Sequence, residues 1–370
     1  MSHSATEPFF GERLRLARLL ASQSLDEVGE AVATSRQYLH QLETDAKVPT
    51  AELRRALADA LEVSDHFFSL PIKAAVSEAD CHFRKLYTTP RTAMAHAAAR
   101  GTLLEQLAMS LDRRVKLPQV DFPDLGRAKS VAEIEAMALA LREHWKLGTD
   151  APIANMTRSL ERAGALVIDF GNLSEKVDAL SISRRRPIVV RSNAKTAAVR
   201  LRFDLAHECG HLVMHQGIVT GDNETEDEAH RFAGAFLFPA KAFIKEFPRS
   251  KSLDWPALYA LKNRWRVSVR AIIRRAYDLG MIDAAKYRTG NIHLSKTGQA
   301  KSERYDDVII PEQPELLRSA LKALAARDIS SYQEMLVDIG LPPTRFATLF
   351  GIESPQLPAN VAFPAFRNRS

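Results

Sequence analysis

The sequence has few cysteines and no long apolar run. Only Cys81 and Cys209 occur among its 370 residues, and they lie 128 positions apart. This excludes a disulfide framework and favours a reducing compartment. No segment approaches 18 consecutive apolar residues, and the N-terminus lacks a basic stretch followed by an apolar one and a cleavage site. We therefore expect a cytoplasmic protein that makes no contact with a membrane.

Charge and apolar content are not extreme either. Apolar residues make up 46% of the chain, which is enough for two or three domains with buried cores. The net charge of +6 suits contact with nucleic acid but does not demonstrate it. The composition is that of an ordinary globular protein, so function has to be sought in local patterns.

The most informative pattern is H-E-C-G-H at residues 207–211. Apolar residues at helical spacing around it predict a helix that begins near Asn193. Histidines four positions apart lie about 40° around the helix axis and roughly 6 Å along it, so both can reach one metal ion. The adjacent glutamate can act as general base on water that the ion acidifies. We expect His207 and His211 to be metal ligands and Glu208 to be the base.

A third ligand is needed for a catalytic zinc site. In the segment 224–240, Glu228, Phe232, Ala235 and Phe236 have helical spacing. One helix can therefore present Glu228 to the metal while its apolar side packs behind the first helix. The sequence predicts Glu228 as third ligand and Zn²⁺ as the ion, with Mn²⁺ as the alternative. For the pentapeptide alone, the alternative is a surface helix with two solvated histidines.

The two segments together resemble the ImmA/IrrE metallopeptidases. The resemblance rests on RLRFDLAHECGHLVMH (200–215) followed by EDEAHRFAGAFLFP (226–239). It extends from about residue 134 to residue 276 and includes REHWKLG (142–148). The resemblance implies the same roles as the spacing does, with metal ligands His207, His211 and Glu228 and the base Glu208.

Three other residues near the motif are not expected to bind the metal. His215 lies about 12 Å from His207 along the helix axis, so we place it behind the ligands or on the surface. His230 follows Glu228 by two positions and is turned about 200° from it, although a role in stabilising a transition state is an alternative. Cys209 stands where leucine is commoner in the family and is expected to pack in the core, with redox sensitivity as the alternative.

The elements before the motif predict a small sheet. Helices around 131–145 and 152–163 precede strand candidates at 165–170, 179–183 and 187–191. This is the order of a zincin-like protease, a class that commonly binds an extended peptide against an edge strand. Either of the last two candidates could be that edge.

Residues 8–68 are predicted to form five short helices. Residues of the N-cap type precede four of them: Ser24, Thr34 or Ser35, Thr50 and Ser64. The tight turn between the second and third helices resembles the lambda-repressor-like XRE helix-turn-helix domains. By that resemblance residues 35–43 form the recognition helix. The side chains expected to contact DNA are Arg36, Gln37, Tyr38, His40 and Gln41.

The charge of this bundle weakens the prediction of DNA binding. Residues 1–68 contain seven basic and eleven acidic residues, a balance of −4. Asp26 stands where the family usually has a glutamine that contacts phosphate, and Ala33 replaces the common turn glycine. A protein-interaction bundle is therefore the alternative. Residues 71–120 carry a balance of +4 and could supply contacts to the DNA backbone.

We thus predict a mainly α protein with a small β-sheet (α+β) in four parts. They are a five-helix bundle at 1–70, a helical connector at 71–120, a zincin-like metallopeptidase domain at 121–290 and a small C-terminal accessory helical region at 291–370. The last part begins with a polar linker, residues 291–312, and a homodimer through this region is left open.

The resemblance implies a metal-dependent endopeptidase coupled to a module that binds double-stranded DNA. Its substrate would be a regulatory protein such as a transcriptional repressor, in a stress or mobile-element response. The alternative is a DNA-binding transcription regulator whose peptidase-like domain is a sensor with little proteolysis. Glu208 favours the first, because a domain that has lost catalysis has no physical need of a general base.

Overall fold

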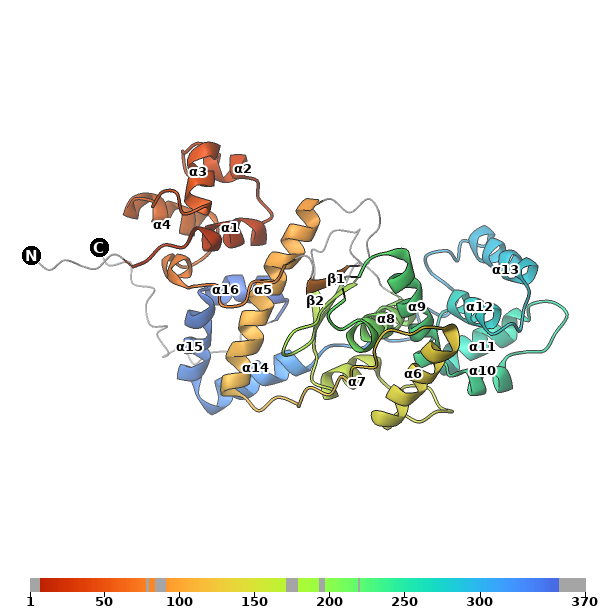
Figure 1. The fold of residues 1–370 in the computed structure, drawn as a ribbon. Coiled ribbons are helices and arrows are strands. Elements are labelled where there is room, and N and C mark those ends of the chain that lie inside the picture. Colours follow the sequence, from red (N-terminus) through yellow and green to blue (C-terminus); the bar gives the residue numbers. More distant parts are fainter. Residues whose placement is uncertain are drawn as a thin grey trace, which may run out of the picture. The chain divides into compact units, whose positions relative to one another are not determined.

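The computed structural model describes residues 7–77, 80–83, 91–170, 179–192, 197–218 and 220–352 (Figure 1). As predicted, the protein is mainly helical with one small sheet. No described helix is long and apolar enough to cross a membrane. Contacts within the chain divide it into two units. The helical unit comprises residues 1–78, 89–117 and 316–370, and the mixed unit comprises residues 79–88 and 118–315.

The helical unit begins with the predicted five-helix bundle. Its elements are α1 (Gly11–Leu20), α2 (Leu25–Ala31), α3 (Arg36–Glu43), α4 (Ala51–Ala60) and the 3-10 helix η1 (Asp65–Ser69). Four N-cap side chains accept a hydrogen bond from the backbone amide three residues on: Ser24, Ser35, Thr50 and Ser64. Between α2 and α3, Ala33 adopts φ +51°, a left-handed conformation that favours glycine. The predicted helix-turn-helix is confirmed.

Four further helices complete the helical unit: α5 (Arg91–Arg114), α14 (Leu316–Arg327), α15 (Ile329–Ile339) and α16 (Pro343–Phe350). Gly340 ends α15 at φ +77°, and its carbonyl accepts a 2.8 Å hydrogen bond from the Ser64 hydroxyl. A Cβ at Gly340 would lie 2.9 Å from the Phe67 Cα, so this close approach requires glycine. On the other side, Asp338 pairs with Arg114 at 2.9 Å. Helix α5 of the predicted connector and helices α14 to α16 of the predicted accessory region therefore share a unit with the bundle, and α5 packs on both α1 and α15.

The mixed unit contains a four-stranded sheet with the order β1-β3-β4-β2. The strands are β1 (Cys81–Phe83), β2 (Leu166–Phe170), β3 (Ala179–Ile182) and β4 (Ile188–Ser192). β4 is parallel to β2 and antiparallel to β3, and β1 is antiparallel to β3. The three predicted strands exist, but the expectation that 179–183 or 187–191 is an edge is wrong. β1 covers β3 and comes from a distant three-residue segment, too short to be recognised by alternation.

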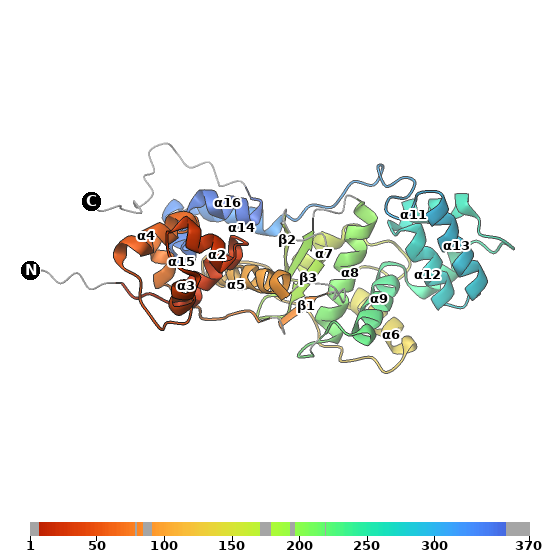
Figure 2. The same cartoon turned by 90° about the horizontal axis from the view of Figure 1, so that it is seen from above.

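Helices cover the sheet in layers (Figure 2). They are α6 (Val131–His144), α7 (Met156–Arg162), α8 (Ala198–Met214) and α9 (Asn223–Leu237). α8 packs on β3 and β4, α7 packs on β2 and α8, and α9 lies between α8 and α6. α8 begins at Ala198 and not near Asn193, which lies outside the described residues.

Arg142 holds the end of α9 in place. Its side chain is fully buried, and its guanidinium donates to the carbonyl of Phe236 at 2.6 Å and to that of Ala151 at 2.5 Å. A third bond goes to the carbonyl of Gly148 at 2.6 Å. The carbonyls of a helix C-terminus lack partners within the helix, and Arg142 satisfies that of Phe236 while its other donors bind the segment after α6.

Four more helices complete the mixed unit: α10 (Ala240–Glu246), α11 (Trp255–Trp265), α12 (Val269–Asp278) and α13 (Ala284–Lys296). The predicted linker at 291–312 overlaps α13, and the rest of it is anchored. Glu303 is buried and accepts hydrogen bonds from the amides of Val269 and Arg270 and from Lys262 Nζ. This segment is therefore part of the mixed unit and not a free linker.

Candidate metal centre

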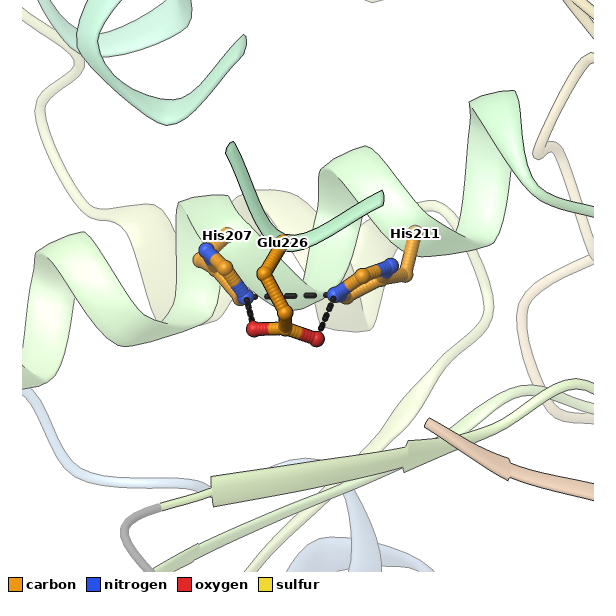
Figure 3. A group of neighbouring side chains, drawn as sticks. All are labelled: His207, His211 and Glu226. Carbon is orange, nitrogen blue, oxygen red and sulfur yellow. Dashed lines mark hydrogen bonds and ion pairs between the residues drawn. The ribbon is translucent and has the colours of Figure 1, made fainter. Parts of the chain in front are cut away.

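Two histidines of α8 and one glutamate of α9 converge on one point (Figure 3). The Nε2 atoms of His207 and His211 lie 3.1 Å apart. The Glu226 carboxylate lies 3.2 Å from His207 Nε2 and 3.4 Å from His211 Nε2. Both histidines are buried, and the Glu226 side chain is 19% exposed. This is the one His/Cys/Asp/Glu cluster with metal-ligand spacing among the described residues.

The spacing of these atoms fits a bound metal ion. Ligand atoms held about 2.0–2.1 Å from one zinc at tetrahedral angles lie about 3.3 Å from one another. In the cluster the two Nε2 atoms are 3.1 Å apart, His207 Nε2 is 3.2 Å from Glu226 Oε2, and His211 Nε2 is 3.4 Å from the other oxygen, Glu226 Oε1. One ligand atom from each residue lies within 4.8 Å of the others. Two imidazole nitrogens and a carboxylate oxygen are also a donor set that zinc and other first-row divalent ions accept.

The structure places Glu226, and not the predicted ligand Glu228, against the two histidines. Both glutamates are in the first turns of α9, two positions and about 200° apart around the helix axis. Glu226 lies in line with buried Ala229 and Ala233, whereas Glu228 lies in line with buried Phe232. Both therefore border the apolar stripe of α9, and only the packing of that stripe against α8 decides which one reaches the histidines.

The electrostatics of the cluster favour metal binding. Burial raises the pKa of Glu226, but the close contacts of its carboxylate with His207 and His211 outweigh burial and hold that pKa well below its usual range. Burial lowers the pKa of His211, so its imidazole is neutral and keeps a lone pair for a metal. The cluster thus presents a carboxylate and a neutral imidazole, the protonation states that ligation needs.

Glu208 projects from α8 toward the sheet. It is buried, and its Oε2 accepts a 2.5 Å hydrogen bond from the hydroxyl of Ser181 on β3. Ser181 is itself fully buried. The hydroxyl fixes the orientation of a carboxylate that stands next to His207 in the chain. The sequence analysis missed Ser181, and the only available signal was a small polar residue between apolar ones in a strand.

Glu228 occupies a different environment, beside His215. Its Oε2 lies 2.8 Å from His215 Nε2, and His215 Nδ1 lies 2.9 Å from His211 Nδ1. His215 is completely buried, which excludes the surface alternative. Arg127 Nε lies 3.4 Å from Glu228 Oε1. Behind His211, therefore, the structure forms a chain of polar groups that the sequence analysis did not predict.

His230 and Cys209 lie close to the ligands. The ring of His230 contacts that of Phe203, with centroids 4.7 Å apart, and its centroid lies 6.4 Å from that of His207. His230 is one helical turn after Glu226, so it is on the side of α9 that carries Glu226. Cys209 is buried in the core, and burial raises the pKa of its thiol, which disfavours the reactive thiolate.

The residues predicted to contact DNA lie on α3 in the helical unit. Arg36, Gln37 and His40 are exposed, whereas Tyr38 and Gln41 are partly covered. All five belong to one helix whose buried residues are Leu39 and Leu42. Arg36 forms a 3.2 Å ion pair with Asp26, and both side chains are more than 60% exposed. An exposed pair of this kind contributes little stability, so Arg36 can exchange Asp26 for another anion.

Each of the two units contains a segment that matches the model of a known family. Residues 160–277 match the model of the IrrE N-terminal-like domain, a peptidase family, and residues 10–66 match that of a helix-turn-helix domain. The chain thus joins a helix-turn-helix domain to an IrrE-like peptidase domain. No curated protein matches the chain.

The IrrE-like match includes every residue of the candidate metal centre. It contains α8 and α9, and with them His207, Glu208, His211 and Glu226. It also contains β3 with Ser181. The helix-turn-helix match spans α1 to α4 and thus the whole of α3. A DNA-binding type of module and a protease-like domain therefore occur in one chain, as the sequence predicted.

Proposed function

We propose that the protein is a metal-dependent endopeptidase that cleaves a regulatory protein, and that its helix-turn-helix domain binds double-stranded DNA. The observation that carries this proposal is the convergence of His207, His211 and Glu226 with Glu208 on the same helix as the histidines. A transcriptional repressor is the proposed substrate, because the same chain carries a domain of the kind that acts at operators. Zn²⁺ is the proposed ion, and Mn²⁺ is the alternative.

The residues have separate roles in this proposal. When bound, a divalent ion supplies Lewis-acid polarisation of the peptide carbonyl and acidifies water. His207, His211 and Glu226 hold the ion. Glu208 accepts a proton from the attacking water through its carboxylate and passes it to the amine that leaves. Ser181 donates to Glu208 Oε2 and so orients the carboxylate.

A peptide substrate would bind as an extended strand, which gains main-chain hydrogen bonds from a sheet edge. The strand nearest the base is β3, since Ser181 of β3 contacts Glu208. β1 already pairs with β3, with His82 opposite Ser181. A peptide that pairs with β3 therefore has to replace β1.

The experiment compares Glu208→Gln with the wild-type chain. The amide keeps the size of the side chain and can still accept from Ser181, but it cannot take up the water proton. We expect unchanged metal content by elemental analysis after dialysis and loss of cleavage in a screen of candidate repressors. Ser181→Ala is the matched control, because it removes the orienting hydroxyl and leaves the base, so cleavage should fall but persist.

A second function, a sensor with little proteolysis, predicts a different result. Cells that carry Glu208→Gln would then respond as wild-type cells do, because the metal and the fold are retained. A normal response in those cells would overturn the peptidase proposal. Loss of the response together with loss of cleavage would support it.

A further inference from the structure

When His211 binds a metal ion through Nε2, its tautomer determines where the protons lie in the chain of polar groups behind it. His211 Nε2 points at His207 and Glu226, where a metal ligand needs a lone pair. A neutral imidazole with a lone pair on Nε2 carries its proton on Nδ1. His211 Nδ1 lies 2.9 Å from His215 Nδ1, so His211 donates there and His215 Nδ1 accepts.

The second ring then determines the next bond. Because His215 accepts at Nδ1, its proton is on Nε2. That atom lies 2.8 Å from Glu228 Oε2, an acceptor when the carboxylate is ionised. Arg127 Nε lies 3.4 Å from Oε1, the other oxygen of the Glu228 carboxylate. Each donor thus meets an acceptor along the whole chain.

Because both histidine rings are buried, a wrong tautomer would be costly. His215 is 0% exposed and His211 1% exposed, so a ring in the wrong tautomer would place two N–H groups or two lone pairs face to face without water to separate them. Partners of a ligating histidine's second nitrogen commonly fix its tautomer and ring orientation. In this chain the partner is a second histidine, whose own tautomer is fixed by a carboxylate.

We propose that His215 and Glu228 are positioning residues that hold His211 in its Nδ1-protonated tautomer and direct its Nε2 lone pair at the metal. The inference rests on the metal centre proposed above. It gives Glu228, which the spacing in the sequence suggested as a ligand, the role of the terminal acceptor. It also gives buried His215 a role other than ligation, because its Nδ1 lies against His211 Nδ1 and its Nε2 against Glu228.

The test measures Zn²⁺ affinity of the full-length chain by competition with a chelator. Glu228→Ala and His215→Phe should each weaken Zn²⁺ binding by about 10–100-fold, the range found for such partners of ligating histidines. Glu228→Gln keeps an oxygen that can accept from His215 and should restore most of the affinity. Glu224→Ala is the control and should leave Zn²⁺ affinity unchanged. It removes a carboxylate that also pairs with Arg127, at 2.7 Å, but is 74% exposed.

A second readout reports the tautomers directly. In the Zn²⁺-bound wild type, ¹⁵N NMR of the histidine rings should show protons on His211 Nδ1 and His215 Nε2. In Glu228→Ala the His215 ring should lose this single tautomer. A variant that keeps the helical circular dichroism of the wild type has kept its fold. A change in the tautomer of the His215 ring in that variant is therefore not due to a general loss of structure. If His215→Phe does not fold, the test relies on Glu228→Ala and Glu228→Gln, because Glu228 is partly exposed.

The outcomes separate this inference from the proposed function. If His207→Ala retains Zn²⁺, the metal centre itself is wrong. If His207→Ala loses Zn²⁺ while Glu228→Ala binds it as tightly as the wild type, only the positioning role is overturned. Equal losses in Glu228→Ala and Glu228→Gln, or a wild-type His211 without a proton on Nδ1, would also overturn it.

Discussion

Helix α8, which carries the two clustered histidines, and helix α3, which is predicted to contact DNA, differ in how much of each is buried. In α8, 15 of 17 residues are buried, including both histidines and Glu208. In α3, two of eight residues are buried, and both are leucines. The functional side chains of α8 therefore face other parts of the chain, whereas those of α3 face outward.

This difference determines what the fold can specify. A buried polar group needs a partner within the protein, because an unsatisfied one costs free energy. The surroundings of His211 thus fix which carboxylate approaches it and which atom carries its proton. On α3 the partners of Arg36 and Gln37 would be outside the chain, so the fold presents these side chains without selecting what they bind.

The largest effect is expected from a substitution in the buried cluster. Glu226→Ala should reduce bound metal from about one ion per chain to near zero, because a site with two protein ligands holds zinc poorly. Elemental analysis after dialysis measures this loss. Asp227→Asn is the control, since Asp227 pairs with Arg231 and Arg274 and not with the histidines. Equal metal content in Glu226→Ala and the wild type would return the role of third ligand to another residue.

A smaller effect is expected from substitutions on the exposed helix α3. Arg36→Ala should weaken binding to a specific DNA site by about 1–3 kcal/mol and leave non-specific binding nearly unchanged. Asp26→Asn should act in the opposite direction, because Asp26 competes for Arg36 and repels phosphate. Footprinting on the protein's own promoter region at low and physiological salt measures both. No binding at either salt concentration would contradict DNA recognition and favour a protein partner.

The third prediction concerns β1, which comes from residues 79–88 between two segments of the helical unit. Proline at both His82 and Phe83 removes the amides of β1 that can pair with β3. The β3 amides that face β1 should then exchange hydrogen at least roughly tenfold faster. Amides of Val167 and Val190 in the β2–β4 pair are the control. Unchanged exchange in β3 would show that β1 does not protect this edge.

The same difference in burial explains how much of the structure could be predicted from the sequence. Features that depend only on residues close in the sequence could be predicted. Ser24, Thr50 and Ser64 cap their helices, and the histidines four positions apart meet on α8. Glu226 could not be distinguished from Glu228, because both border the apolar stripe of α9. That choice depends on how this stripe packs on α8, where Phe232 lies so close to Gly210 that a Cβ there would be 3.0 Å from the Phe232 ring.

Long-range pairings were also beyond the sequence. The bond between Ser64 and Gly340 joins residues 276 positions apart, and it places the C-terminal helices in the helical unit. β1 pairs with a strand almost a hundred residues away in the chain. Neither contact produces a periodic pattern, because each depends on which surfaces meet after the helices have formed.

The smallest expected effect tests the turn that leads into α3. Ala33 has φ +51°, where an L-residue costs roughly 1–2 kcal/mol and glycine costs less sterically but loses more chain entropy. The net result should be that Ala33→Gly raises the free energy of unfolding by up to about 1 kcal/mol. Ala56→Gly, within α4, should lower it by about 1 kcal/mol, because glycine is a poor helix former. Urea unfolding of both variants measures the two shifts, and shifts of the same sign would show that the left-handed turn at Ala33 is not strained. A raised stability without a change in DNA affinity would mean that the turn supports α3 but does not set how its exposed side chains meet a partner.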